Sequence, residues 1–456
     1  MGLTAYGTAL AANWPPADAT TPVVPATSTS EPTLTVEVAF RDQPSGGFQL
    51  DVSQLDDGVV LSDWDSWATV PGCRAVDVKR RFNRESGSWD PSTAKLRFNN
   101  RDRRFDPLYT DGPYKGVLPN RPIRVTFTFP TDTGTLTKRA FFGYIDSWMT
   151  DWNLPEQGQA DVAATDVSKI LAATHMPERE TVTGEADHSG ERADRLIADA
   201  QLPEVWLEAD RGIATLQGTT WDVDVLAHLR DIGEAEFGYM YVDGAGTLHL
   251  MDRYRLMTDA RSVSTQVVFG DDHTNGEVPY NKLAVDYDDR IIINEAIVSR
   301  EGGRTGSNVV VQSQQKFGDV PGAPTSVELF QRQSKSLRTL YNSDPQSEGL
   351  GQYIVGLFEW PDPQVGAIEI VPRDGAMWAA ALGLELGDRI TIRRRPPGAP
   401  DTLLQIDCHV TGINWKLRPD KPWACVIETS PARTISDLYR CDHPTFGRLD
   451  VNRLAP

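Results

Sequence analysis

The sequence predicts a β-rich α+β multi-domain protein, in which two β-barrel or sandwich-like domains flank a mixed α+β section and both terminal segments are extended. Three observations predict it. Short stretches of alternating apolar and polar residues recur early and late in the chain, amphipathic helical patterns lie between them, and proline-rich or irregular stretches occupy the ends. With 456 residues, 39% hydrophobic and 24% charged, the chain is long enough for several folded domains.

The predicted boundaries follow these changes of pattern. They are a Pro/Thr-rich extended arm at 1–33, a first β domain at 34–165, an α+β domain at 166–265, a second mixed section with a long loop and a helix at 266–380, the closing strands of a barrel at 381–432, and a C-terminal extension at 433–456. The arm cannot bury enough apolar surface to offset the entropy lost on ordering by itself. An unordered tail and an arm lying on a neighbouring subunit both remain open.

The first β domain is predicted from its alternation. Residues 34–40 and 123–129 each place apolar side chains at every second position, which is typical of half-buried strands. Residues 96–98 and 141–145 predict further strands. Several short strands separated by turn signals indicate a sandwich or a barrel.

The middle of the chain predicts helices and a hairpin. Ser189 is expected to cap one helix, which Pro203 ends, and a second helix follows Thr219. A hairpin is predicted over 239–250, because its two apolar segments flank the turn Asp-Gly-Ala-Gly at 243–246.

The second mixed section and the end of the chain return to strands around one long helix. Residues 283–287 and 291–293 are β-like in composition. A helix is predicted from Asp344, as its cap, to Pro361, with Pro345 at its first position. Strands are expected again at 390–392, 408–410 and 424–427.

The charge distribution has one local anomaly. The chain carries −19, which argues against a dedicated nucleic-acid-binding protein but not against DNA passing nearby. Between 79 and 104, nine basic residues oppose three acidic ones. The candidate subunit-interface residues in this segment are Arg80, Arg81, Arg84, Arg101, Arg103 and Arg104. Solvated loops with local ion pairs, an inter-subunit contact through arginine–carboxylate pairs, and contact with DNA are the three interpretations.

No catalytic, cofactor-binding or metal-binding residue is predicted. The sequence lacks HExxH, P-loop and GxGxxG motifs. The tripeptides at 187–189 (Asp-His-Ser) and 441–443 (Cys-Asp-His) hold catalytic residue types, but adjacency in sequence does not build a triad. The acid pairs at 222/224, 271–272 and 288–289 lack the spacing of a calcium loop and are expected to be solvated carboxylates.

The cysteine content and the hydropathy indicate the compartment. Four cysteines with no CxxC pair favour free thiols in a reducing cytoplasm over a zinc site or a disulfide framework. No stretch reaches the ~18–20 apolar residues of a spanning helix. The N-terminus also lacks the pattern of a secretory signal.

Several segments in a fixed order carry a resemblance to a known family. They are Trp-Asp-Pro at 89–91, Ala-Lys-Leu-Arg-Phe-Asn-Asn-Arg-Asp at 94–102, Phe-Asp-Pro at 105–107, Pro-Asn-Arg-Pro-Ile-Arg-Val at 119–125, Gly-Tyr-Ile-Asp at 143–146, Leu-Glu-Leu-Gly-Asp-Arg-Ile at 384–390 and Val-Thr-Gly-Ile-Asn-Trp at 410–415. In this respect the chain resembles, from about 34 to 432, the minor tail proteins of siphophages that infect actinobacteria. These proteins are similar in turn to the baseplate hub of contractile phages.

The resemblance implies a structural role without catalysis or cofactor. It implies a virion protein of the tail tip, assembled in the host cytoplasm, that forms a homotrimeric hub ring closing the tail tube. The implied partners are a distal tail protein, a tape measure protein and other minor tail proteins, with phage DNA passing transiently. The alternative is a receptor- or cell-wall-engaging tail protein, either a carbohydrate binder or a peptidoglycan hydrolase, whose exposed tryptophans would stack on sugars; the candidates are Trp64, Trp67, Trp148 and Trp152.

Overall fold

The structure is a computed structural model of the whole chain. It describes residues 31–40, 67–83, 88–132, 134–151, 158–176, 182–287, 289, 291–300, 307–317, 320–398, 402–419 and 421–433, with two short strands beyond them, β23 (Leu438–Tyr439) and β24 (Arg453–Leu454).

The N-terminal part of the chain forms a set of antiparallel strands. In chain order they are β1 (Thr33–Ala39), β2 (Trp67–Thr69), β3 (Cys73–Asn83), β4 (Ser88–Trp89), β5 (Thr93–Asn99), β6 (Pro122–Thr131), β7 (Gly134–Asp151) and β8 (Gln159–Thr165). Alternation explains them: in β6, every second side chain from Ile123 to Phe129 is fully buried. The apolar faces of these strands form one side of a large core.

The C-terminal part forms a second set of strands. Its elements are β14 (Thr265–Phe269), η2 (His273–Asn275), β15 (Lys282–Asp286), β19 (Gln364–Ile370), α9 (Gly375–Gly383), β20 (Arg389–Arg394), β21 (Leu404–Arg418) and β22 (Lys421–Pro431). The strand order is β14-β20-β21-β22-β19-β15. Val278, which precedes β15, donates its N–H to the Val268 carbonyl of β14 (2.8 Å) and accepts from the Gly270 N–H (3.0 Å). The two ends of this order are therefore linked, as in a barrel.

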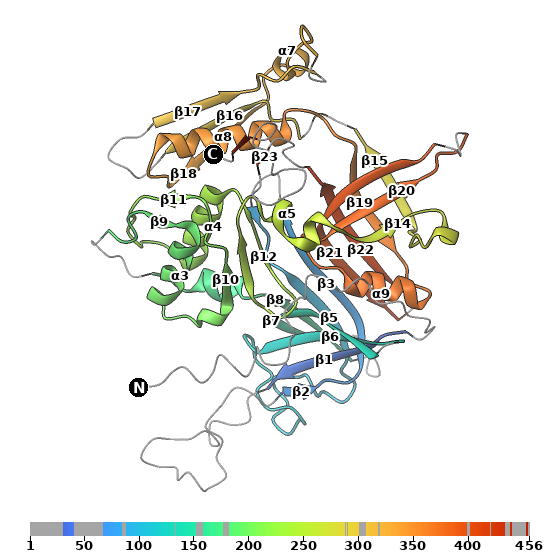
Figure 1. The fold of residues 1–456 in the computed structure, drawn as a ribbon. Coiled ribbons are helices and arrows are strands. Elements are labelled where there is room, and N and C mark those ends of the chain that lie inside the picture. The colour runs from blue at the N-terminus through green and yellow to red at the C-terminus, as the bar shows by residue number, and fades with distance from the viewer. Residues whose placement is uncertain are drawn as a thin grey trace.

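The two strand sets belong to one hydrogen-bonded sheet. β21 is long enough to pair with β20 through its first half and with β3 through its second half, where Trp415 lies opposite Val78. The path β15-β19-β22-β21-β3-β5-β8-β7-β6-β1-β2 thus runs without interruption (Figure 1). A single apolar cluster extends under both sets, including Phe127 and the stacked tryptophans Trp378 and Trp415.

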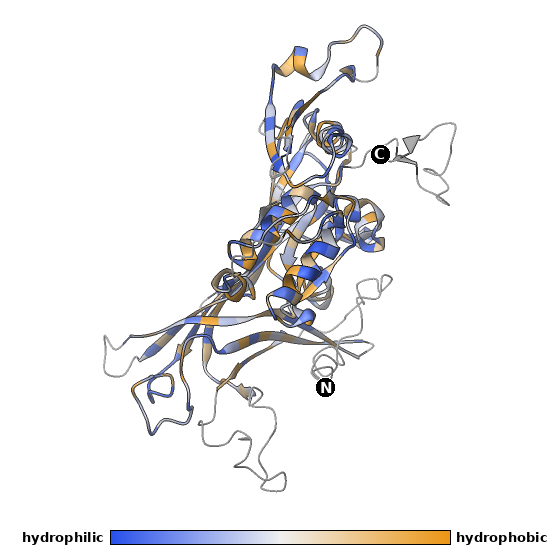
Figure 2. Ribbon diagram, turned by 90° about the vertical axis from the view of Figure 1, so that its left-hand side faces the viewer, coloured by the Kyte–Doolittle hydropathy of each residue, from blue (hydrophilic) through white to orange (hydrophobic). Residues whose placement is uncertain are grey.

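A mixed α+β lobe packs beside the sheet. Its elements are α2 (Ser168–Ala173), β9 (Asp187–His188), α3 (Ser189–Asp199), η1 (Glu204–Trp206), β10 (Leu207–Ala209), β11 (Thr215–Leu216), α4 (Val225–Glu236), β12 (Tyr239–Val242), β13 (Leu248–Met251), β16 (Glu295–Arg300), β17 (Ser307–Gln312), α7 (Ser326–Phe330), β18 (Ser334–Thr339) and α8 (Asp344–Phe358). A second apolar cluster joins α3, α4, β16 and α8. Figure 2 shows α7 projecting at the top of the molecule.

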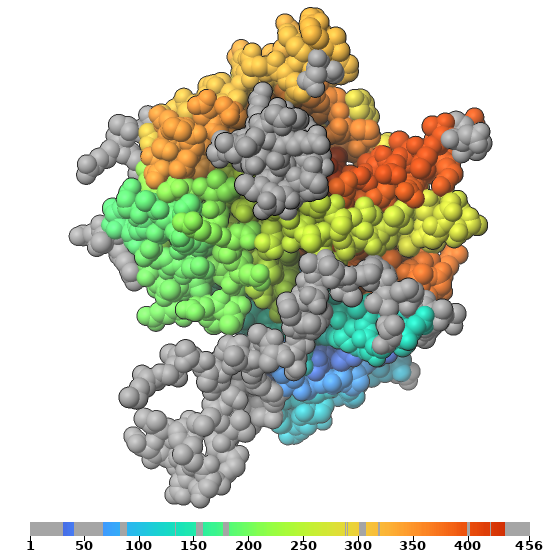
Figure 3. Space-filling view, in the orientation of Figure 1, coloured from blue at the N-terminus to red at the C-terminus, as the bar shows by residue number. Residues whose placement is uncertain are grey.

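A short helical segment connects this lobe with the second strand set. It contains α5 (Arg255–Thr258) and α6 (Ala260–Val263) and leads directly into β14. In Figure 3 it crosses the front face as a yellow-green band between the green lobe and the red strands. The chain therefore passes from one core to the other along the surface rather than through a long linker.

Local signals explain several helix ends, and three expectations need correction. Asp224 caps α4, since its carboxylate accepts from the Ala227 N–H (2.8 Å). Ser189 does not cap α3: His188 is the N-cap, and its N–H donates to Glu191 (3.1 Å). Ser343, not Asp344, precedes the first turn of α8. Residues 291–293 form no strand; β16 begins at Glu295 instead.

The predicted fold class is confirmed, because the chain is a β-rich α+β protein with a large antiparallel sheet and several smaller sheets. The predicted domain boundaries remain predictions, although the core of the lobe draws on both 166–265 and 266–380. Nearly all of the predicted arm (1–33) and extension (433–456) lies outside the described residues. Within the described part, no helix combines the length and apolarity needed to cross a membrane.

Candidate functional site

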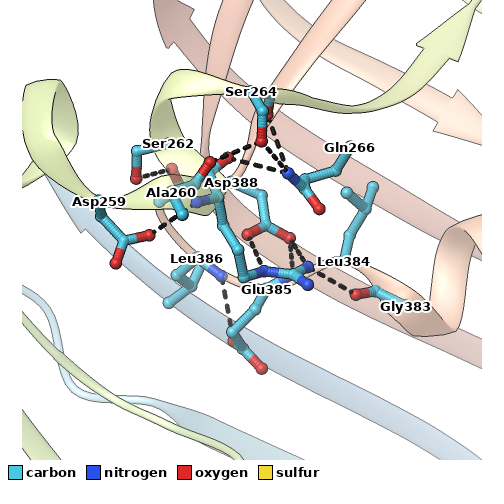
Figure 4. Close-up of polar contacts among 12 residues, drawn as sticks. Asp259, Ala260, Ser262, Ser264, Gln266, Gly383, Leu384, Glu385, Leu386 and Asp388 are labelled. Atoms are coloured by element: carbon cyan, nitrogen blue, oxygen red, sulfur yellow. Dashed lines mark hydrogen bonds and ion pairs between the residues drawn. The ribbon is translucent and has the colours of Figure 1, made fainter. Parts of the chain in front are cut away.

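A cluster of buried and half-buried charged side chains lies where the two strand sets and the lobe meet. The turn between α9 and β20, residues 384–388, brings two acidic side chains, Glu385 and Asp388, to this point (Figure 4). We call the turn and its cationic partners the junction. The partners are Arg80 on β3, Lys138 on β7 and Arg261 on α6.

Glu385 binds the first strand set to the second. Its Oε1 accepts from Arg80 Nη1 (2.6 Å), and its Oε2 accepts from Lys138 Nζ (2.6 Å). Lys138 also donates to the Leu384 carbonyl (3.0 Å). Burial alone would raise the pKa of Glu385, but the charges of Arg80 and Lys138 outweigh it and hold that pKa well below its usual range. The carboxyl is therefore ionised at neutral pH.

Asp388 binds the same turn to the helical segment. Arg261 donates from Nε to Oδ1 (2.7 Å) and from Nη2 to Oδ2 (2.5 Å), which is a bidentate pair. Oδ2 also accepts from the Glu385 N–H (2.8 Å), and Ser262 Oγ donates to the Gly387 carbonyl (2.8 Å). These bonds fix the position of the turn from both sides, and with it the relative position of the two strand sets.

The β12–β13 hairpin closes the junction from the side of the lobe. At its tip, a Cβ on Gly244 would lie 1.8 Å from the Arg139 carbonyl oxygen of β7, so only glycine allows this approach. Behind the tip, His249 lies 3.4 Å from Asp243 and 3.6 Å from Glu208. Burial opposes protonation of the imidazole, but the Asp243 carboxylate outweighs it and raises the pKa of His249.

The six arginines predicted as interface residues occupy different environments. Arg80 is only 2% exposed and belongs to the junction, whereas Arg81 points to the other face of β3 and pairs with Asp90 (2.5 Å). Arg103 pairs with Asp106 (2.6 Å), and Arg104 donates from Nε to Asp102 (2.7 Å). Such local ion pairs are what the first interpretation, solvated loops with local ion pairs, predicts.

The two remaining arginines are Arg101 and Arg84. Arg101 is exposed, and no hydrogen bond or ion pair of its side chain is found within the described ranges. Arg84 lies outside the described residues. Whether any of the six contacts another subunit therefore stays a prediction.

The structure joins part of the basic segment at 79–104 to two basic residues from the end of the chain, which sequence reasoning did not connect with it. The side chains of β3 and β5 that alternate with the core residues point outward, and so do those at the end of β21. We call this surface the basic face; it consists of Lys79, Arg81, Lys95, Arg97, Lys416 and Arg418. The signal in the sequence was the alternation of Lys416 and Arg418 around Leu417, but the pairing of β21 with β3 could not be inferred from it.

The residues considered for chemistry serve structural roles where the structure describes them. Ser189 Oγ donates to Glu236 (2.7 Å), Asp224 caps α4, and Asp271 pairs with Arg395 (2.6 Å). The tripeptide at 441–443 and Asp288 lie outside the described residues. Among the described residues, no group of three or more His, Cys, Asp or Glu could hold a metal ion.

Two of the four tryptophans considered for sugar stacking have partners within the chain. The Arg124 guanidinium lies 4.2 Å from the centre of the Trp67 ring. Trp148 stacks on Phe105 (5.7 Å), and its Nε1 donates to the Leu118 carbonyl (3.0 Å). Trp64 and Trp152 lie outside the described residues.

Comparisons with known proteins place the fold. No family model and no curated protein sequence matches the chain. Among solved structures, it is similar to the tail protein from Neisseria meningitidis MC58, with a TM-score of 0.52, 10% identity, and coverage of 87% of this chain and 96% of that one. It is also similar to the 43 kDa tail protein of prophage MuSo2 from Shewanella oneidensis, with a TM-score of 0.51, 11% identity, and coverage of 80% and 97%. The chain thus shares its fold, over most of its length, with solved tail proteins.

Proposed function

We propose that the chain is a structural virion protein of a phage tail tip, of the kind found in siphophages that infect actinobacteria. It forms a homotrimeric hub ring that closes the tail tube and connects it to distal tip proteins. The observation that carries the proposal is the fold shared with two tail proteins, each covered almost completely.

The junction favours a structural role over catalysis, because its charged groups are paired with one another. Two strand sets in each chain would give a trimer six similar sets, which matches the sixfold symmetry of a tail tube. A ring of this kind requires the two sets to keep a fixed relative position. The continuous β21–β3 pairing and the Glu385 ion pair connect the two sets directly, and the Asp388 ion pair holds the same turn to α6.

Interaction partners follow from this role. A distal tail protein and a tape measure protein would bind the ring on its two sides, and DNA would pass through it without lasting contact. Among the six predicted interface arginines, Arg101 is best placed for a subunit contact, because it is exposed and its side chain lacks a partner in the described part of the chain.

The experiment is a mass measurement combined with localisation. Purified protein analysed by native mass spectrometry should give three copies per particle, and cryo-electron microscopy of the virion should show the chain at the end of the tail tube. Absence of the chain from the virion would contradict the proposal. Release of peptidoglycan fragments or retention on a glycan resin by the purified protein would favour the receptor- or cell-wall-engaging alternative.

A further inference from the structure

The basic face contains two lysines that form no ion pair with any described residue. Lys95 on β5 and Lys416 on β21 lie opposite Asp77 on β3, one on each side of it. Asp77 is engaged by Arg418 (3.5 Å). No ion pair to Lys95 or Lys416 is found in the part of the chain that the structure describes, and both side chains are exposed.

The other cations of the basic face are already neutralised. Arg97 forms a bidentate pair with Asp161 (2.7 and 3.0 Å), and Lys79 pairs with Glu428 (3.2 Å). The free charge of this face is therefore concentrated on Lys95 and Lys416. Two strand spacings separate them, about 10 Å, and their flexible stems let both ammonium groups reach one acidic partner.

The lobe carries a surface of the opposite sign. We call it the α4 acidic surface; it consists of Asp222, Asp231 and Glu234. Asp231 and Glu234 lie one turn apart on the same side of α4 and are exposed. Neither carboxylate forms an ion pair with a residue in the described ranges. Partial burial, and then the neighbouring carboxylates of Glu234 and Asp222, raise the pKa of Asp231 to about 6, so this surface repels itself in the isolated chain.

We propose that the basic face of one chain binds the α4 acidic surface of a second copy of the same chain. Charge complementarity selects this partner. The chain carries −19 overall, the basic face offers two lysines without ion pairs to described residues, and the α4 acidic surface offers two carboxylates in the same situation. The contact joins two different surfaces, so it is head-to-tail. Such a contact forms a ring when the rotation between successive copies closes, and an open filament when it does not. The inference rests on the proposed function and assigns the surfaces through which the ring closes.

The test is charge reversal with rescue. Self-association of the purified full chain is measured by analytical ultracentrifugation and native mass spectrometry at several salt concentrations. Lys95→Glu with Lys416→Glu should weaken association at least tenfold, and so should Asp231→Lys with Glu234→Lys. The variant that carries all four changes should regain most of the lost affinity, because the attraction is restored with its direction reversed.

A matched control has the same change in charge elsewhere. Lys282→Glu with Arg373→Glu alters two exposed basic residues outside the basic face and should leave association unchanged. Circular dichroism of every variant should match the wild type, since all the altered side chains are exposed. Association of the wild type should also weaken as salt rises, which tests the electrostatic contact without any variant.

The outcomes test the proposed contact and the hub ring separately. This contact is overturned if neither double charge reversal weakens self-association of the chain. It is also overturned if the variant with all four changes associates more weakly than both double variants. Either result leaves the hub ring standing. A wild type that stays monomeric at every concentration and salt overturns the ring and the contact together. The wild type is also tested for binding of duplex DNA. If Lys95→Glu with Lys416→Glu abolishes DNA binding but leaves self-association unchanged, the basic face is assigned to nucleic acid instead.

Discussion

Replacing Glu385 with glutamine should destabilise the protein by about 3 kcal/mol, the lower end of the range for breaking a buried ion pair. The magnitude follows from the surroundings. The change leaves Arg80, whose side chain is 3% exposed, without a counter-ion, but 28% of the Glu385 side chain remains accessible to solvent. Lys138 is affected less, because it keeps its bond to the Leu384 carbonyl.

The assay is urea unfolding followed by tryptophan fluorescence, with a double-mutant cycle. Arg80→Met combined with Glu385→Gln should cost clearly less than the sum of the single changes, because the orphaned cation is then removed. The control is Asp161→Asn, which breaks the exposed pair with Arg97 and should cost no more than about 1 kcal/mol.

The dependence on pH provides a second measurement with a definite sign. The folded-state pKa of Glu385 is lowered, so its contribution is complete above the ordinary value of about 4.3 and is lost as pH falls through the folded value. The difference between wild type and Glu385→Gln should therefore be constant near neutral pH and shrink in acid. A loss near neutral pH no larger than that of Asp161→Asn would refute the argument that the junction fixes the two strand sets.

Three further predictions concern the hairpin and the loop after β5. The pKa of His249 is raised in the folded state, so its charged form stabilises the fold fully below about pH 6.5 and less as pH rises. His249→Phe should therefore remove this dependence of the urea midpoint on pH between 6 and 8. A variant whose urea midpoint changes with pH as in the wild type would contradict this. Gly244→Ala should lower the free energy of unfolding by about 1–3 kcal/mol by displacing the hairpin tip from β7. The control is Gly366→Ala, because Gly366 also lacks a left-handed φ but its added Cβ would meet no atom within 4 Å. Asn100→Ala should cost about 1–3 kcal/mol, since the fully buried side chain accepts from the Phe105 N–H (2.9 Å); a midpoint equal to wild type would show that the loop does not depend on it.

Much of the local structure could be predicted from the sequence. The alternation at 34–40 and 123–129 marks β1 and β6, the Asp-Gly-Ala-Gly turn marks the β12–β13 hairpin, and Pro345 marks the first turn of α8. These signals are local: each depends on the periodicity of one strand or helix, or on the residues of one turn. They were reliable where apolar periodicity was strong and failed at 291–293, where three isoleucines precede the strand rather than form it.

The junction could not be predicted, because its members are distant in sequence. Arg80 and Arg81 are neighbours with the same charge, and only the register of β3 sends one to the interior and the other to the surface. Glu385 lies 305 residues from Arg80, and no sequence pattern in either segment indicates that the two residues pair. The same holds for Lys416, which joins the basic face only through the pairing of β21 with β3.

The pairing of β3 with β21 also has a consequence for synthesis. β3 is made early, but the strand that covers its edge begins at Leu404. At about 10 residues per second, a ribosome needs on the order of half a minute to reach it. During that time the nascent chain presents an unpaired strand edge, a template for pairing with other chains. Aggregation during expression should therefore depend on translation speed and on chaperones that bind nascent chains, and truncation before β21 should yield insoluble protein even though the whole first strand set is present.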